Sequence, residues 1–214
     1  SKICFVFPGR RASLFFQREL SALIDKPLFS PSLITISDLF SELSGLRNAD
    51  KLDCLYRLYS LYCDINENPE PFDDFVYWGE TLLSDFDDTD KFLADPCRLF
   101  ANIKELKELD TDYSFLSERQ LNSIKSFWAS FHNGEESDKK SKFKSLWSLM
   151  LPLYTNLRVS LESDGAGYEG MIYRKIAEQI SNGDTVNVDS LLSKYSYVVF
   201  IGFNALNKCE KTLL

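Results

Sequence analysis

The sequence lacks the features of secreted and membrane proteins. No apolar run approaches the roughly 20 residues needed to cross a bilayer, and we expect no signal peptide before the first predicted strand. The five cysteines are scattered, odd in number and without a C-x-x-C pair, which argues against a disulfide framework and predicts reduced thiols. We therefore expect a cytoplasmic protein that makes no membrane contact.

Metal sites and nucleophilic sites find little support in the sequence. The single histidine, His132, has no cysteine or histidine near it, so we interpret it as a solvated loop residue. No serine or cysteine stands in a nucleophile elbow. The acidic run at residues 85–90 lacks the glycine and glutamate of a calcium loop, and we interpret it as a helix end followed by a new helix capped at Asp88 or Thr89. The sequence predicts no metal and no cofactor in this chain.

The composition is that of an acidic globular protein. Hydrophobic residues make up 44% of the 214 residues, with 17 Phe and 10 Tyr, which is enough for a sizeable core. The formal net charge is −8, so the chain is not a general polyanion binder. Any contact with nucleic acid requires a local basic patch.

Segments with strand character lie near both ends of the chain, and helical patterns fill the middle. Short apolar runs at residues 3–7, 33–36 and 197–201 predict strands. Between about residues 50 and 180, apolar side chains recur at helical spacing. Examples are Phe75, Gly79 and Leu82, then Leu121, Ile124, Trp128 and Phe131, then Met150, Leu153, Tyr154, Leu157 and Leu161.

This order predicts an α/β fold with a large, mostly helical insertion. Parallel strands need crossover connections, and a crossover can host an insertion. We predict a small parallel sheet built from residues 1–48 and 185–214, with a helical subdomain over residues 49–184. Pro152 falls inside the longest helical pattern and is expected to kink that helix or to mark a junction between two helices.

Residues 2–20 have the position of a phosphate-binding loop without its chemistry. They predict a strand, a turn at residues 8–13 and a helix from about Leu14. A working loop needs glycines, a lysine and a Ser/Thr for magnesium, whereas this turn offers Gly9 and Ser13 without a Gly-Lys-Ser/Thr sequence. In phosphate-loop motor proteins a second strand ends in carboxylates, and those positions hold Ile201 and Gly202. The sequence therefore predicts no ATP hydrolysis by this chain.

Three segments resemble the amino-terminal region of AddB-like proteins, in the divergent form seen in Bacteroidetes-type bacteria. They are FVFPGRRASLFFQREL, the run FDDFVYWGETLLSDFDDTDKFLADP at residues 72–96, and VVFIGFNALNKCEKTLL. These proteins are helicase-like subunits with a PD-(D/E)XK nuclease that act in recombinational DNA repair. The resemblance implies a degenerate helicase-type domain with a helical insertion, working on double-stranded DNA ends beside a motor helicase–nuclease partner subunit.

The resemblance also implies where the chemistry of the full-length parent protein lies. The family's exonuclease motif and its iron–sulfur cysteines sit near the far carboxyl terminus, and neither has a match in this sequence. Some family members keep a Gly-Lys-Ser loop, from which this chain departs at the Gly9 turn. We therefore expect this chain to be a non-catalytic region that forms part of the path of the DNA and makes contacts with the partner subunit.

Two basic groups are candidates for contact with DNA. Arg10 and Arg11 could meet a phosphate at the start of a helix, or they could pair with acidic residues or face water. Lys139, Lys140 and Lys142 precede an aromatic residue and could form a patch on which a base stacks. Alternatively, they could be the solvated first turns of an amphipathic helix, because three acidic residues stand just before them.

A protein-interaction module that never touches DNA is the alternative function, and the acidic charge of the chain supports it. Convergence of the five basic residues on one face would favour the DNA function over the module. Phosphate-ester chemistry at the Gly9 turn is a third hypothesis, but no base or metal ligand adjoins that turn in the sequence.

Overall fold

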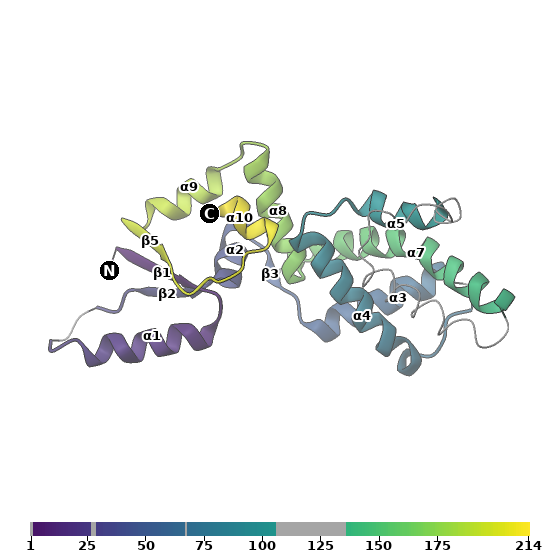
Figure 1. The fold of residues 1–214 in the computed structure, drawn as a ribbon, viewed down its shortest axis with the longest axis horizontal. Coiled ribbons are helices and arrows are strands. Elements are labelled where there is room, and N and C mark those ends of the chain that lie inside the picture. The colour runs from purple at the N-terminus through teal and green to yellow at the C-terminus, as the bar shows by residue number, and fades with distance from the viewer. Residues whose placement is uncertain (1, 27–28, 67, 106–135) are drawn as a thin grey trace, which may run out of the picture.

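The strands predicted near the two ends of the chain form one small parallel sheet. The computed structural model describes residues 2–26, 29–66, 68–105 and 136–214, with side chains described outside residues 101–148. Strand β1 (Ile3–Phe7) lies between β2 (Ser32–Thr35) and β5 (Tyr197–Phe200), and both neighbours run parallel to it (Figure 1). The chain is therefore a mixed α/β protein with a small parallel sheet and a mostly helical remainder, as predicted.

Helices cover the two faces of this sheet unequally. Helix α1 (Arg10–Ala22) lies along one face, where the Phe16 ring is 4.7 Å from that of Phe5. Helices α2 (Ile36–Ser44) and α9 (Val186–Ser193) lie on the opposite side (Figure 1). Cys4 and Val6 are fully buried, whereas α1 contains no buried residue. The core of this part of the molecule therefore lies on the α2 side of the sheet.

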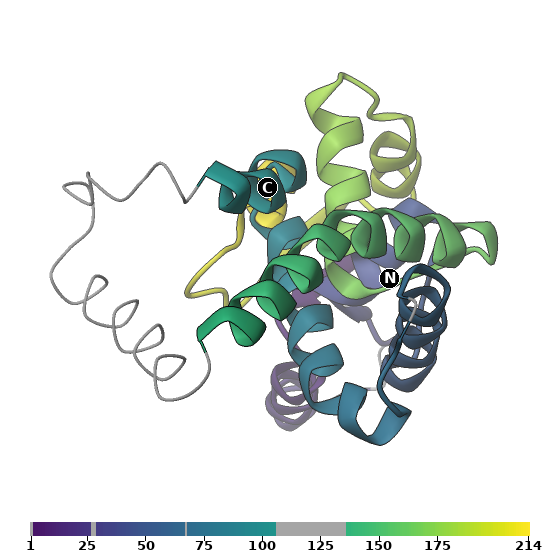
Figure 2. The ribbon, with the colours of Figure 1, turned by 90° about the vertical axis from the view of Figure 1, so that its right-hand side faces the viewer.

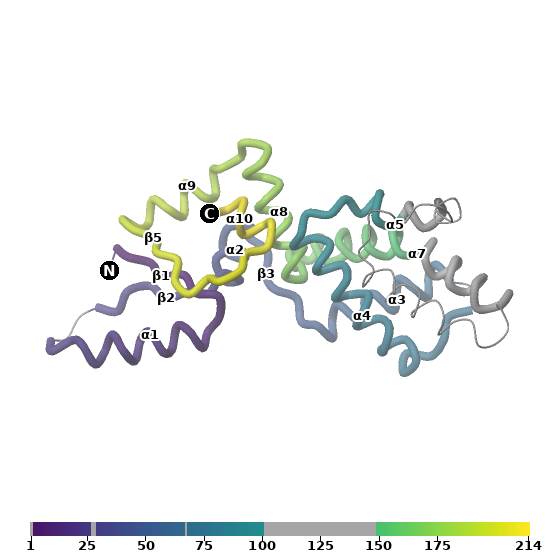
Figure 3. Tube along the Cα trace, viewed as in Figure 1, coloured from purple at the N-terminus to yellow at the C-terminus, as the bar shows by residue number. Residues whose placement is uncertain are grey.

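The short strands β3 and β4 connect the sheet part of the chain to its helical part. Strand β3 (Arg47–Asn48) leads into α3 (Lys51–Ile65) and α4 (Phe72–Lys91), and α5 (Pro96–Glu105) follows. Helix α7 (Glu136–Ser163) leads back to β4 (Ala166–Gly167), which pairs in parallel with β3. The helical part thus extends from the sheet end of the molecule and gives it an elongated shape (Figures 1 and 3).

The structure corrects part of two local predictions about this helical part. Residues 85–90 form a helix end, the last turns of α4, but the next helix is not capped at Asp88 or Thr89: it begins after Asp95, whose carboxylate accepts the N–H of Cys97 at 2.9 Å. Of the two alternatives for Pro152, the junction between two helices is wrong, because α7 continues through this residue. Leu153, Tyr154 and Leu157 are buried beyond the proline, and their packing favours a continuous helix.

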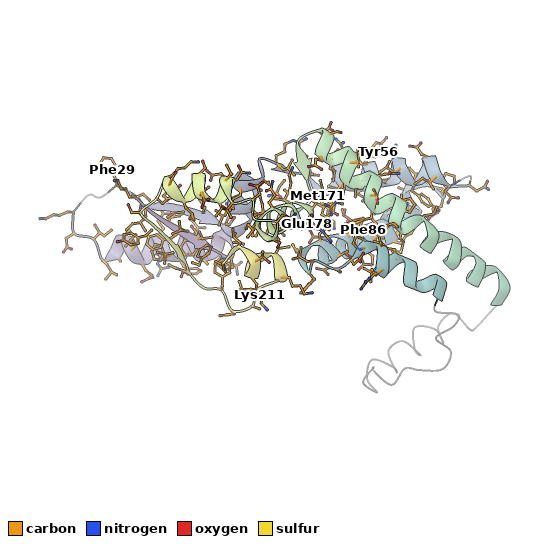
Figure 4. The ribbon with its side chains drawn as sticks, turned by 90° about the horizontal axis from the view of Figure 1, so that it is seen from above. Phe29, Tyr56, Phe86, Met171, Glu178 and Lys211 are labelled. Atoms are coloured by element: carbon orange, nitrogen blue, oxygen red, sulfur yellow. The ribbon has the colours of Figure 1, made fainter. Side chains whose placement is uncertain are left out.

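Helix α8 (Glu169–Ser181) joins the two ends of the molecule. It packs against α2, α4 and α10 (Lys208–Leu213), and its Tyr173 ring stacks on Phe40 with centroids 4.0 Å apart. Met171, on this helix, lies at the middle of the molecule in Figure 4. Among the helices that the structure describes, none is both long and apolar enough to span a membrane.

The close approach of α8 to α4 depends on a glycine. The N–H of Gly170 donates to the Asp87 carboxylate at 2.6 Å, which caps the first turn of α8 from a different helix. A Cβ at position 170 would lie 2.3 Å from the carbonyl oxygen of Asp87. Only glycine therefore permits this contact without a shift of the two helices.

We expect the substitution Gly170→Ala to lower the free energy of unfolding by about 1–3 kcal/mol, because α8 must move away from α4. Urea unfolding followed by circular dichroism measures this change. Gly9→Ala is the matched control, since Gly9 has an extended φ of −170° and nothing within 4 Å of an added Cβ. Equal stabilities of the two variants would contradict the steric argument.

Candidate functional site at the carboxyl edge of the sheet

The turn after β1 is too short to wrap a phosphate group. Strand β1 ends at Phe7 and α1 begins at Arg10, so only Pro8 and Gly9 connect them. The helix thus begins earlier than the predicted start near Leu14, in keeping with the high helix propensity of arginine and alanine. A phosphate loop needs several successive backbone N–H groups around the anion, and two residues cannot supply them.

The structure brings this turn next to the end of β5. The Ile201 N–H donates to the Val6 carbonyl at 2.9 Å. Gly202 has a φ of +82°, and a Cβ at that position would lie 3.9 Å from the Cδ of Pro8. Because β1 continues to one neighbouring strand through α1 and the chain returns on its other side, the two strand ends form a topological switch point. Parallel sheets place their ligand sites at such points.

Arg10 and Arg11 stand at this switch point. Both are exposed, and within the described part of the chain neither makes an ion pair. No side chain caps the N-terminus of α1, and its first turn contains no acidic residue. The Ser13 N–H donates to the Gly9 carbonyl at 3.4 Å. Two unpaired guanidinium groups beside an uncapped helix N-terminus make this edge attractive to anions.

Few acidic side chains lie at this edge: Asp38, after β2, accepts the N–H and hydroxyl of Thr35 in the capping box of α2. Ile201 and Gly202 stand where a motor protein places its acids, and the next acid along the chain is Glu210. The Glu210 carboxylate is occupied, since it accepts the N–H of Asn207 at 2.9 Å in the capping box of α10. Across the described residues, no group of three or more His, Cys, Asp or Glu side chains could hold a metal ion.

The side chains of the predicted lysine patch lie outside the described part of the structure. Lys139, Lys140 and Lys142 fall on the first turns of α7, where the structure does not describe side chains. His132 and Trp128 lie outside the described residues altogether. Arg10 and Arg11 are thus the described members of the predicted DNA-contacting set.

Sequence reasoning missed a polar cluster at the centre of the molecule. Asp90 of α4 is completely buried, and its carboxylate accepts hydrogen bonds from side chains of α7 and α8 and from the residue that precedes α8. These partners are Tyr154, Arg158, Tyr168 and Arg174, and the Arg158 Nη1 atom lies 2.8 Å from the Asp90 Oδ1 atom. We call these five residues the Asp90 cluster.

One local signal marks Asp90 as buried. It follows Phe86 by four residues, so it lies on the same apolar stripe of α4 as Leu82 and Phe86. A charged residue on a core-facing stripe must find a partner, because an unpaired buried charge is costly. The arginines that pair with it are far away in sequence, and no local pattern identifies them.

The Asp90 cluster perturbs the ionisation of its members. Burial, together with the negative charge of Asp90, raises the pKa of the Tyr154 and Tyr168 phenols well above their usual value. Burial alone would lower the pKa of Arg158, but the Asp90 carboxylate, Tyr154 and Tyr168 together more than offset this effect and raise the pKa. The arginines therefore stay charged and the phenols stay neutral. Since Asp90 has no exposed surface, the cluster is a structural junction.

A cavity of about 460 Å³ lies beside this junction, between α2, β3, α3, α4 and the start of α8. Its charged groups are already paired. The Lys51 Nζ atom lies 3.0 Å from the Glu80 carboxylate. The Lys91 ammonium group forms ion pairs with Asp87, at 2.7 Å, and with Glu169. These pairs join the elements around the cavity and leave little charge for a ligand.

Comparisons with known proteins identify no family for this chain. A scan against protein-family models found no matching family, and a search of curated proteins found no matching relative. The function must therefore be argued from the geometry of the switch point and of the surfaces around it.

We expect Asp90→Asn to lower the free energy of unfolding by about 3–5 kcal/mol, because the mostly buried guanidinium groups of Arg158 and Arg174 lose the buried carboxylate that they share. Urea denaturation measures this loss. Asp88→Asn is the control: Asp88 lies two residues away, is exposed, and makes no described ion pair, so its replacement should change stability by less than about 0.5 kcal/mol. A loss below about 1 kcal/mol for Asp90→Asn would contradict the role given to the cluster.

We expect stability to fall as pH rises above about 9. Burial raises the pKa of Cys54 to about 11 and that of Cys209 to about 12, and the pKa values of Tyr154 and Tyr168 are also raised. Above pH 9 to 10 the unfolded chain loses these protons while the folded chain keeps them, which favours unfolding. Urea unfolding at a series of pH values, with ultraviolet titration of the phenols, tests this; constant stability up to pH 11 would contradict it.

Proposed function

We propose that this chain is a non-catalytic, helicase-like DNA-handling region of a DNA-repair helicase–nuclease subunit. The observation that carries the proposal is the pair of exposed arginines, Arg10 and Arg11, at an uncapped helix N-terminus on the switch point of a parallel sheet. Phosphate groups of DNA are bound by arginine side chains and by helix N-termini in this way. The full-length parent protein would be an exonuclease working on double-stranded DNA ends beside a motor helicase–nuclease partner subunit.

The absence of catalysis in this proposal rests on the same edge. The two-residue connection at Gly9 leaves no chain to surround a triphosphate. Ile201 and Gly202 offer no carboxylate for magnesium or for an attacking water. The region would thus keep the strand order of a motor domain for binding DNA, with neither ATP hydrolysis nor nuclease activity of its own.

The alternative function is a protein-interaction scaffold without DNA contact. The net charge of −8 supports it, because such a chain repels polyanions over most of its surface. DNA binding by the chain separates the two functions.

We expect fluorescent duplex DNA ends to bind this chain weakly, and the affinity to fall with increasing salt. Arg10→Ala and Arg11→Ala should each reduce the slope of log affinity against log salt by about 1, since each removes about one phosphate contact. Fluorescence anisotropy at several salt concentrations measures this slope. Arg18→Ala is the matched control, because Arg18 is an exposed arginine on the same helix that lies near Glu19.

Four outcomes bear on these hypotheses. A slope that is lower for Arg10→Ala and Arg11→Ala but unchanged for Arg18→Ala supports DNA handling. No DNA binding by the wild-type chain favours the scaffold function. Tight binding of ATP and Mg²⁺, measured by calorimetry, would contradict the degenerate nucleotide site, and turnover of that ATP would contradict the non-catalytic function.

A further inference from the structure

A groove on the helical part of the molecule is unrelated to the sheet edge. It has a volume of about 350 Å³ and is lined by α4 and by Met150 of α7, and the ribbons of these two helices cross in Figure 2. Its lining consists of Tyr77, Trp78, Thr81, Leu82, Asp85 and Met150. Leu82 and Met150 are nearly buried, whereas Tyr77 is 81% exposed. The groove is therefore an apolar trough with an aromatic wall on its open side.

The aromatic wall is held in place by the surrounding core. The indole N–H of Trp78 donates to the Glu70 carboxylate at 2.6 Å. The Trp78 ring also meets the rings of Phe75 and Tyr62 edge-on, with ring centroids 4.4 Å and 5.1 Å apart. A ring fixed on three sides is a preorganised platform, and binding on it costs little conformational entropy.

A carboxylate with no partner among the described side chains lines this groove. Asp85 makes no hydrogen bond or ion pair through its carboxylate among the residues that the structure describes. Burial, reinforced by the nearby charge of Asp88, raises its pKa. Asp74 and Asp88 lie on the same face of α4 by their helical spacing, and neither has a described ion pair. This face is thus acidic and lacks a described cation.

We propose that the groove docks a basic segment of a protein partner, which inserts an arginine side chain along Tyr77 and Trp78 and places its guanidinium group against Asp85. Charge decides between occupants. DNA would bring phosphate groups against three carboxylates. A wholly apolar segment would bury Asp85 without a partner, at a large cost. An arginine suits both the aromatic wall and the Asp85 carboxylate. Its planar cation stacks on aromatic rings and forms a bidentate pair with a carboxylate.

The test uses the whole chain and two fluorescent hexapeptides, one alternating leucine with arginine and the other alternating leucine with glutamate. Anisotropy should show binding of the leucine–arginine peptide alone, and high salt should weaken it. Asp85→Asn should reduce the affinity by about tenfold or more, since it removes the charge that the guanidinium group meets. Asp184→Asn makes the same charge change in the loop before α9, and should leave the affinity unchanged.

A second pair of variants tests the aromatic wall. Tyr77→Ala should weaken peptide binding about threefold, the size of an exposed cation–π contact. Tyr56→Ala is the matched control, because Tyr56 is also an exposed tyrosine on a helix. Its side chain is 67% exposed, and that of Tyr77 is 81% exposed. Circular dichroism and thermal unfolding should show that all four variants fold. In particular, Asp85→Asn should not lower stability, because Asp85 has no described bond to lose.

Several results would overturn the inference. Equal binding of both peptides would show that charge does not select the occupant. Equal losses for Asp85→Asn and Asp184→Asn would place the peptide elsewhere. Self-association of the chain that Tyr77→Ala abolishes, without peptide binding, would make a second copy the occupant. DNA binding through Arg10 and Arg11 should be the same in Asp85→Asn, so this inference can fail while the proposed function stands.

Discussion

The buried carboxylate of Asp90 is the interaction on which the rest of the structure depends. It joins α4 to Arg158 of α7 and to Arg174 of α8, and the carbonyl oxygen of the same residue accepts the Cys209 thiol of α10 at 3.3 Å. Four helices from both ends of the molecule therefore meet at one residue. Removing this charge would take from Arg158 and Arg174, both mostly buried, the carboxylate that they share, and Arg174 would keep only its exposed partner Glu178 as an ion pair.

The sheet edge depends on this junction through α8 and α10. Helix α8 packs on α2, which follows β2, and α10 follows the loop that begins at Ile201 and Gly202. The position of the Gly9 turn relative to Gly202 is thus set partly by side chains that lie in the helical part. This arrangement explains why a chain with such a small sheet keeps a defined carboxyl edge: the helical part supplies packing that three short strands cannot.

The sequence predicts the sheet well because strands and crossovers obey strong rules. Apolar runs identified the three strands of the larger sheet, whereas the strand order that brings Gly9 beside Ile201 and Gly202 comes from the structure alone. The start of α1 and the cap of α5 were missed, because arginine and aspartate occur both in helices and in turns. The partners of Asp90 could not be found, since Arg158 and Arg174 are 68 and 84 residues away from it. Such pairs are fixed by tertiary packing alone.

The position of β1 between its two neighbours has a consequence for the order of folding. β1 pairs with β2 after a short connection, but its other partner, β5, is about 190 residues further along the chain. During synthesis, β1 and β2 emerge first, and one edge of β1 stays open until the whole helical part has been made. The β3–β4 pair closes the helical part before β5 appears. The sheet is thus completed last, and until then β1 offers an apolar edge on which chaperones or other nascent chains can act.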